Sequence, residues 1–462
     1  MAKKKVSAAN VAADVAADDA DNYLVFLAES PTPAHAVVAV CNRLRSAGFA
    51  ARSAHEPLVT AAGERLFVVA PDGRSVFAAV VGSRSPVATG FSIWGAHTDS
   101  PDLRIRLNPV RSEAGTVQLL TQVHGGIIRR AWLDRPLMLA GVVHTLLRDS
   151  AGVPRFHPIS GQPLMQSQLV SLPRPLAVIP DLAIHLDREK NDKGAINPET
   201  ALHAIFGSAA PVEDAITALS AELGIPLADV DGFDLHLVPW QPPMRVGIDG
   251  SLLFGPRHDD LAMVYAGTAG LCRAVDVDPA PSHTAVAVFF DAEETGSLTS
   301  SGASSSFLRD MLVRLTRNHP ETPADADIEV ALGRSLVLSG DMAHALHPNH
   351  LDKHDRAHAP IINQGLVVKV NSNDRYASSG ETVAAFRGLC ERADVPLQAY
   401  IHRQDMTCGS TIGPITAAKL GARTVDFGAP MWAMHSTGET MGAVDMGYAV
   451  RLATVFFSGG RS

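Results

Sequence analysis

The sequence predicts an α/β fold: a mainly parallel sheet, flanked by helices and interrupted by an inserted β-rich domain. Two observations lead to this prediction. Beyond Asp249, short apolar runs typical of strands alternate with segments of helical periodicity, as in proteins with a largely parallel sheet. Residues 105–247 instead hold many prolines and glycines, several strand-like segments and one clear helix, over 212–223.

The elements beyond Asp249 can be placed by their periodicity and by the turn residues that bound them. We expect helices at 259–274, 302–318, 379–393, 411–420 and 439–458. We expect strands at 284–290, 335–338, 366–370, 397–401 and 422–426. The strands are short and apolar, which is typical of a sheet that is covered on both faces.

The N-terminal part supplies further elements of the same kind. Residues 20–50 have helical periodicity with a break at Ser30–Pro33, and strand-like runs follow at 65–70, 75–81 and 91–96. The domains that we expect are a low-complexity lead-in at 1–18, an α/β domain formed by 19–104 and 248–462, and an inserted domain at 105–247.

Composition and charge exclude several classes of function. The chain has 462 residues and a net charge of −9, so it would gain nothing from counterion release on a nucleic acid, and an anionic membrane surface would repel it. No apolar run approaches the ~18 residues of a membrane span. The four cysteines are scattered, with no CxxC pair, which predicts neither a disulfide framework nor a thiolate zinc site. We expect reduced thiols and a cytoplasmic location.

The first motif that suggests chemistry is Gly95-Ala96-His97-Thr98-Asp99-Ser100-Pro101. His97 follows an apolar strand, and neutral imidazole is a good zinc ligand. Asp99 would accept the second ring N–H and orient the imidazole. Alone, a motif of this kind is more often an ordinary polar turn.

The second motif places three carboxylates directly after a fully apolar strand, in Phe289-Phe290-Asp291-Ala292-Glu293-Glu294. Such crowding is costly unless a cation offsets the repulsion. Adjacent glutamates can divide the work, because one can bind a metal while the other takes a proton from water. The alternative is a solvated acidic loop.

A third motif begins with Asp341, which also follows an apolar strand. Behind it histidines recur every three or four residues, at His344, His347, His350, His354 and His358. A histidine series of this kind is more often a solvated surface than a set of ligands, but here it follows a candidate metal carboxylate.

Two weaker elements complete the set. Asp259 opens a predicted helix, where a carboxylate also suits the helix dipole, and His435 follows a strand-turn just before the final helix. Together the candidates comprise two imidazoles and several carboxylates without thiolates. This inventory is typical of a two-metal hydrolase, in which a shared carboxylate bridges ions that are ~3.5–4 Å apart.

In sequence, the chain resembles the aspartyl aminopeptidase family of dinuclear zinc aminopeptidases. The segments GAHTDSP, GPRHDDL, FDAEETGS, SGDMAHALHPN, VKVNSNDRYAS, CGSTIGPI and MHSTGE occur in the family's order and approximate spacing, from about residue 20 onward. The resemblance implies the α/β/α sandwich of zinc peptidases. It also implies the release of single N-terminal residues, with a preference for Asp and Glu.

The resemblance also implies a role for each site residue. His97 and Asp341 would hold one zinc ion, Glu294 and His435 a second, and Asp259 would bridge the two; other divalent metals are compatible with one site. Glu293 would be the general base that activates water, and Asp99 would orient His97.

The substrate and the assembly are implied in the same way. Lys369 resembles the residue that meets an acidic substrate side chain, although alone it reads as an exposed strand lysine. His344 resembles a histidine near the substrate, and His185, in the inserted domain, one that a neighbouring subunit supplies. The family forms tetrahedral dodecamers through the inserted domain, with an enclosed chamber that admits short peptides.

Two positions depart from the family pattern. Asp260 stands where the family often has Asn, which adds a negative charge beside the metals, and Gly438 stands where many members carry Arg. Two alternatives stay open: a related two-metal enzyme, such as a neutral aminopeptidase or a carboxypeptidase-like deacylase, and a non-catalytic carrier that kept the fold. A substrate panel and metal content with turnover separate them.

Overall fold

A computed structural model describes residues 8–56, 58, 60–208, 211–226 and 229–459. The chain divides into two compact units. The first comprises Met1–Asp99, Pro243–Met434 and Glu439–Ser462, and the second comprises Ser100–Pro242 and His435–Gly438. Of the expected lead-in at 1–18, residues 1–7 lie outside the described part, and the remainder belongs to helix α1 (Ala8–Glu29).

The first unit is built on a nine-stranded mixed sheet in the order β1-β2-β3-β13-β4-β14-β18-β16-β17. These strands are β1 (Ala50–Arg52), β2 (Arg65–Val69), β3 (Val76–Val80), β4 (Phe91–His97), β13 (Thr284–Phe290), β14 (Leu336–Gly340), β16 (Leu366–Val370), β17 (Leu397–Ile401) and β18 (Arg423–Gly428). The central strands β13, β4, β14 and β18 are parallel, and antiparallel pairs join them to β3 and to β16. The predicted α/β fold with a mainly parallel sheet is confirmed.

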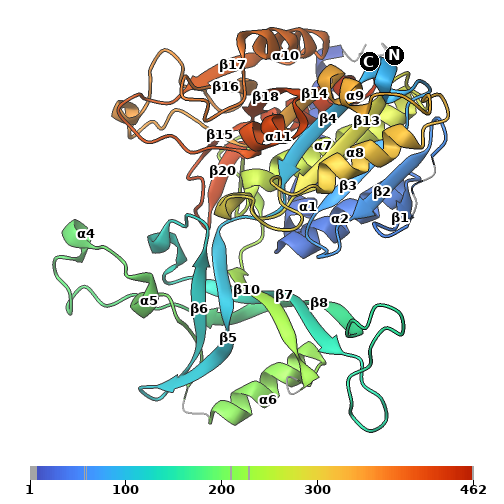
Figure 1. Ribbon diagram of the computed structural model, residues 1–462. Coiled ribbons are helices and arrows are strands. Elements are labelled where there is room, and N and C mark those ends of the chain that lie inside the picture. The colour runs from blue at the N-terminus through green and yellow to red at the C-terminus, as the bar shows by residue number, and fades with distance from the viewer. Residues whose placement is uncertain (1–7, 57, 59, 209–210, 227–228, 460–462) are drawn as a thin grey trace, which may run out of the picture. The chain divides into compact units, whose positions relative to one another are not determined.

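Helices cover both faces of this sheet (Figure 1). In β13 the side chains alternate, so that Phe289 packs into the core on one face and Val288 into the core on the other. All seven residues of β13 are therefore buried, as expected for a central strand between two layers. One face carries α1, α2 (Pro33–Ser46), α7 (His258–Val277), α10 (Gly380–Arg392) and α12 (Ala443–Phe457). The other carries α8 (Phe307–Arg317), α9 (Ile328–Arg334) and α11 (Ile412–Leu420).

Close packing of α7 depends on two glycines. A Cβ on Gly267 would lie 2.6 Å from the indole of Trp94 on β4, and one on Gly270 would lie 2.3 Å from Ala453 on α12. Only a residue without a side chain lets the helix approach both neighbours this closely. The N-terminus of α7, which carries Asp259, is thereby held against the central strands.

A small second sheet of the first unit has the strand order β11-β12-β20-β19-β15. Its strands are β11 (Met244–Val246), β12 (Leu252–Gly255), β15 (Ala343–His344), β19 (Pro430–Trp432) and β20 (Glu439–Gly442). The sequence predicted a helix from residue 439, but 439–442 is strand β20, which pairs with β12 and β19. The polar stretch Glu439-Thr440 carries no apolar alternation that would have indicated a strand.

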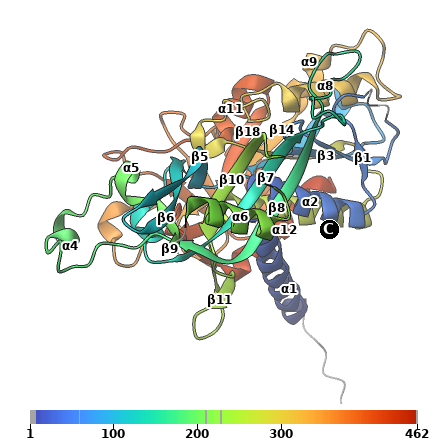
Figure 2. The ribbon, with the colours of Figure 1, turned by 90° about the horizontal axis from the view of Figure 1, so that it is seen from below.

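The second unit is a closed barrel in the order β10-β5-β6-β9-β8-β7, with α6 (Val212–Leu223) packed against β8 and β5 (Figure 2). Its strands are β5 (Asp102–Glu113), β6 (Thr116–His124), β7 (Pro136–Leu146), β8 (Met165–Val178), β9 (Ala204–Ser208) and β10 (Gly232–Pro239). The expected boundary at residue 105 falls inside β5, because the apolar alternation of this strand already begins at Leu103. Short helices complete the chain: α3 (Pro86–Thr89), α4 (Lys190–Lys193) and α5 (Pro198–Ala201). Among the described residues, no helix has the length and apolarity of a membrane span.

Candidate functional site

The candidate residues converge because the parallel strands end at one edge of the sheet. Phe290, the last residue of β13, lies opposite His97, the last residue of β4. Beside them β14 ends at Gly340, and the N–H of Asp341 donates to the carbonyl of Phe427 on β18 at 2.9 Å. Loops at the carboxyl ends of neighbouring parallel strands meet in space, which is where ligands bind in open α/β sheets.

His97, Asp259 and Glu294 form a first group of potential metal ligands, since one donor atom of each lies within 4.8 Å of the others. The Nδ1 of His97 donates to the carbonyl of Asp99 at 3.0 Å, and its Nε2 lies 3.4 Å from Asp259 Oδ1. The ring proton therefore sits on Nδ1, and Nε2 faces the carboxylates. One imidazole nitrogen and two carboxylates make a ligand set that suits zinc.

Asp259, Asp260 and Asp341 form a second group, in which one carboxylate oxygen of each residue lies within 4.8 Å of the others. Because Asp259 belongs to both groups, a single carboxylate stands between two clusters of donors. This is the arrangement that a pair of neighbouring cations requires.

Asp99 holds the loop that carries both glutamates. Its Oδ1 accepts the N–H of Glu293 at 2.9 Å and its Oδ2 accepts the N–H of Glu294 at 3.3 Å. These bonds fix the short 3-10 helix Glu293–Thr295, which is entered through Ala292 with a positive φ of 65°. Asp99 thus contacts His97 and positions Glu293 and Glu294 together.

Glu293 lies in a strongly acidic environment. Partial burial raises the pKa of its carboxyl well above the usual value; His97 opposes this shift, and Asp341, Glu294 and Asp259 add to it. A glutamate with a raised pKa takes up a proton more readily than an ordinary carboxylate does. The third carboxylate of the loop, Asp291, is instead paired with Arg74, whose Nε lies 3.1 Å from Asp291 Oδ2.

Lys369 is a buried partner of Asp341 and not an exposed strand lysine. Only 2% of its surface is exposed, and its Nζ lies 3.3 Å from Asp341 Oδ2. The ammonium also donates to the carbonyl of Met342 at 3.1 Å and lies over the ring of Tyr376. A buried lysine needs a partner for its charge, and here a candidate metal ligand is that partner.

Two supporting carboxylates were missed in the sequence. Glu439 Oε2 accepts the N–H of Asp259 at 3.1 Å, and Asp426 accepts hydrogen bonds from the hydroxyls of Ser339 and Thr411. Glu439 holds the shared ligand at the start of α7. Its partner is remote in the chain, so no local pattern could have revealed this role.

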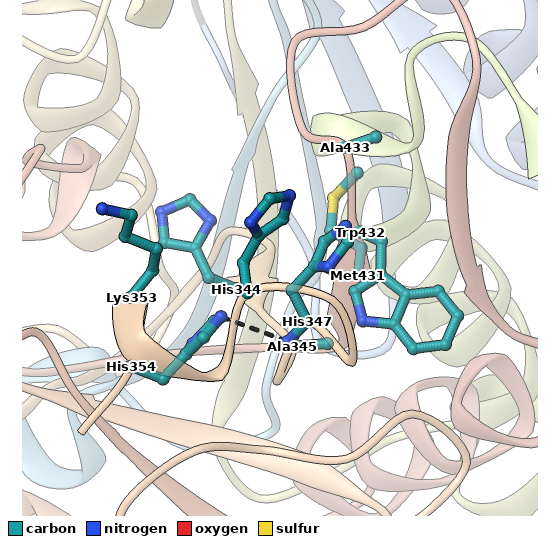
Figure 3. Close-up of a pocket in the computed structure, with 9 residues that line it drawn as sticks. His344, Ala345, His347, Lys353, His354, Met431, Trp432 and Ala433 are labelled. Atoms are coloured by element: carbon teal, nitrogen blue, oxygen red, sulfur yellow. Dashed lines mark hydrogen bonds between the residues drawn. The ribbon is translucent and has the colours of Figure 1, made fainter. Parts of the chain in front are cut away.

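Four of the five histidines that follow Asp341, all except His358, line a pocket of about 410 Å³ (Figure 3). The backbone N–H of His347 donates to Nε2 of His354 at 3.1 Å, as the dashed line in Figure 3 marks. The pocket is lined by His344, Ala345, His347, His350, Lys353, His354, Met431, Trp432 and Ala433. This lining combines one ammonium and four imidazoles with an apolar wall and includes no carboxylate. His344, expected near the substrate, thus shares a cavity with three further histidines.

Two predicted residues lie in the second unit. His435 lies in the loop between β19 and β20, not next to the final helix as expected, and its Nδ1 donates to the carbonyl of Gly126 at 3.0 Å. The ring proton is therefore on Nδ1, so that a metal would be bound through Nε2. His185 is exposed in a turn of the barrel unit.

Residues 26–457 match the family model described as "Aminopeptidase I zinc metalloprotease (M18)". The chain belongs to the M18 family. "Probable M18 family aminopeptidase 2" of Stutzerimonas stutzeri is 41% identical over 439 residues, which cover 94% of this chain and 96% of that relative. The family assignment makes the chain a metal-dependent aminopeptidase, and the N and O donors of the first group fit zinc.

Solved structures agree with this membership. The chain in the cryo-EM structure of the Ape4 and Nbr1 complex is 32% identical and has a TM-score of 0.89, with coverage of 98% of this chain and 88% of that chain. The S. cerevisiae mApe1 dodecamer has a TM-score of 0.81 at 24% identity and covers 96% of this chain and 97% of that chain. The latter likeness is one of fold.

Proposed function

We propose that this M18 member is a dinuclear zinc aminopeptidase that releases single N-terminal residues from short peptides and prefers Asp and Glu. The observation that carries the proposal is the pair of donor groups that share Asp259. A single structural cation would need only one such group, whereas two-metal hydrolases need a common carboxylate.

Five side chains would hold the ions: His97, Asp259, Glu294, Asp341 and His435. The resemblance pairs His97 with Asp341, whereas in the structure the donor atoms of His97 gather with those of Glu294. When bound, zinc supplies a lowered pKa for water and stabilises negative charge on the scissile carbonyl oxygen.

Glu293 is the proposed general base. It lies one residue before a proposed ligand, and its raised pKa favours the uptake of a proton. It would take a proton from the attacking water and later give it to the leaving amine. Asp99 would keep Glu293 in place through the backbone hydrogen bond to Oδ1.

Two groups of basic side chains in this chain suit the recognition of an acidic substrate residue. Lys369 is the residue that the resemblance suggests, but its ammonium already contacts Asp341 and Met342. The pocket that includes His344 and Lys353 offers basic side chains without a competing carboxylate in its lining. We therefore propose that Lys353 and the pocket histidines share the recognition of an acidic side chain with Lys369.

Self-association as a tetrahedral dodecamer is part of the proposal. A fold relative, mApe1 of S. cerevisiae, is described as a dodecamer. In the second unit, His185 lies between Ile184 and Leu186, whose exposed side chains are apolar and suit a subunit contact. Four free cysteines are consistent with a reducing, cytoplasmic location.

The test is the hydrolysis of peptides that differ only in an N-terminal Asp, Glu, Leu or Ala, before and after treatment with a chelator. We expect chelator-sensitive release of Asp and Glu, with Leu and Ala poor. Efficient release of Leu would contradict the acidic preference and keep the metal chemistry, and no release by zinc-loaded protein would favour a carrier.

The variant Lys353→Met tests whether this pocket recognises the acidic side chain of the substrate. We expect kcat/KM for the Asp peptide to fall about tenfold relative to the Leu peptide, because a charge-assisted contact contributes about 1.5–3 kcal/mol. Lys419→Met, which removes an exposed lysine from α11, is the matched control. If Lys353→Met left the ratio of kcat/KM for the Asp and Leu peptides unchanged, recognition of the acidic side chain would rest on Lys369.

A further inference from the structure

The segment 257–259, at the start of α7, is not held by regular helical structure. Asp259 has backbone angles of φ −82° and ψ 108°, and Asp260 has φ −119° and ψ 21°, so neither residue is helical. Arg257 has a positive φ of 65°, which places it in the left-handed region that glycine favours. Contacts with other parts of the fold therefore have to position Asp259, and its hydrogen bond to Glu439 is one of them.

Helix α1 makes another such contact through Tyr23. A hydrogen bond of 2.7 Å joins the Oη of Tyr23 to the Nδ1 of His258, the residue that precedes Asp259. The two rings also pack against each other, with their centroids 5.6 Å apart. Both residues are fully buried. Breaking a hydrogen bond between two buried polar groups is costly, because water does not replace the missing partner, so this bond fixes His258 relative to α1.

Arg257 ties the same segment to the end of helix α1. Its Nε donates to the carbonyl of Ser30 at 3.0 Å, and its Nη2 donates to the carbonyl of Leu27 at 3.4 Å. Both carbonyls lie at the C-terminal end of α1. The last carbonyls of a helix have no partner within the helix, and a cation is favoured beside them. The residue with the positive φ is thus anchored by α1 as well.

Helix α1 is itself firmly fixed, so that it can act as a support. Ala20, Phe26 and Leu27 are fully buried in the core on the same face of the large sheet as α7. Further along α7, Arg273 donates to the buried carboxylate of Asp19 at 3.0 Å. Helix α1 is therefore bonded to α7 both at the start of that helix and near its end.

We propose that Tyr23 is a positioning residue of the metal centre: through His258 it holds the backbone that carries Asp259, the carboxylate shared by the two donor groups. This inference rests on the proposed function, in which Asp259 bridges two ions. It makes the N-terminal helix α1 part of the support of that centre. The influence of Tyr23 on Asp259 passes through one side-chain hydrogen bond and the backbone of the adjacent residue.

The variant Tyr23→Phe removes the hydroxyl and keeps the ring, so it breaks the hydrogen bond to His258 and leaves the packing in place. The experiment uses the full chain. Competition with a chelating indicator measures the zinc affinity, and the absorption spectrum of the Co²⁺-loaded protein reports the geometry around the ion. We expect zinc to bind about tenfold more weakly, because the loss of groups that orient metal ligands costs about 10–100-fold in affinity. The Co²⁺ spectrum should change as well.

The control is Tyr265→Phe on α7. It removes the hydroxyl of another buried tyrosine, whose ring packs against Tyr23 with the centroids 5.6 Å apart. This variant should bind zinc and Co²⁺ as the wild type does. Equal losses of zinc affinity in Tyr23→Phe and Tyr265→Phe would show a general effect of packing between α1 and α7 and would overturn the inference.

A double substitution tests the route through His258. In a His258→Leu background the hydrogen bond is already absent, so adding Tyr23→Phe should cause no further loss of zinc affinity. A further tenfold loss would mean that Tyr23 acts by another route, and the inference would fail. Zinc affinity and a Co²⁺ spectrum like those of the wild type in Tyr23→Phe would overturn the inference and leave the proposed metal centre standing. A wild-type protein that bound no zinc would overturn both.

Discussion

Strands β13 and β8 show how differently the two units use the same secondary structure. Every residue of β13 is buried, whereas in β8 most side chains are exposed, and Met165 has 59% of its surface in contact with solvent. β13 lies between two layers of helices, whereas β8 belongs to a barrel and packs against α6. Each unit has a core of its own, but only the first unit of the two encloses its central strands between helices on both faces.

We infer from this difference that the first unit carries out the chemistry and that the barrel unit makes the contacts between subunits. Rigid, doubly covered strands end at the donor groups, so the first unit provides the fixed geometry that catalysis requires. The barrel unit leaves apolar side chains such as Ile159 (91% exposed) in solvent, which is costly unless another surface covers them. Four experiments follow from this comparison.

The largest effect is expected at the catalytic loop of the first unit. Glu293→Gln should lower kcat by about 10²–10⁴-fold with metal content unchanged, because it removes the proton acceptor and keeps the shape. Turnover numbers and metal analysis on the same sample measure both. Glu391→Gln on α10, an exposed glutamate, is the control. Near-normal turnover by Glu293→Gln would remove the proposed base.

A pair of truncations compares the two strands directly. Phe289→Ala in β13 should destabilise the protein by about 3–5 kcal/mol, because it opens a cavity between sheet and helices. Met165→Ala in β8 should change stability by less than about 0.5 kcal/mol. Denaturant unfolding of both variants measures the difference, and similar losses would mean that β8 is covered in solution.

A substitution at an exposed apolar position of the barrel unit should weaken the association of subunits without affecting their folding. Ile159→Ser should shift the protein towards smaller assemblies in sedimentation velocity and leave the unfolding of the subunit nearly unchanged. Leu298→Ser, at an 85% exposed position of the first unit, is the matched control and should preserve the assembly. If both variants retain the wild-type size, Ile159 does not contribute to the subunit contact.

The smallest effect concerns Asp445 at the start of α12. Burial raises the pKa of Asp445 to about 7, although the N–H groups of Asn363 and Gly365 oppose the shift. The folded state therefore holds a proton that the unfolded chain releases above pH ~4, and stability falls as the pH rises from about 4 to about 7. The unfolding temperature of metal-free protein should drop by a few degrees between pH 5 and pH 8. Asp445→Asn should show less of this drop, and equal slopes would contradict the assignment.

The sequence predicted those elements that a short stretch of residues specifies by itself, through its apolar pattern and the turns that bound it. Strands β16 and β17 were expected at their observed bounds because each is a short apolar run between turns. Strand β20 was missed because Glu439–Gly442 has no apolar alternation. The roles of Glu439 and Asp426 were also missed, because hydrogen bonds to residues remote in the chain leave no trace in the local pattern.

Asp99 also limits how this site can be altered. One carboxylate accepts the backbone N–H groups of both Glu293 and Glu294, and the carbonyl of the same residue accepts the ring N–H of His97. The proposed base, Glu293, and two proposed metal ligands, Glu294 and His97, are thus held by the side chain and the carbonyl of one residue. An engineer who wished to move the base relative to the metals would have to rebuild Asp99 first, because any change that shifts this residue shifts all three together.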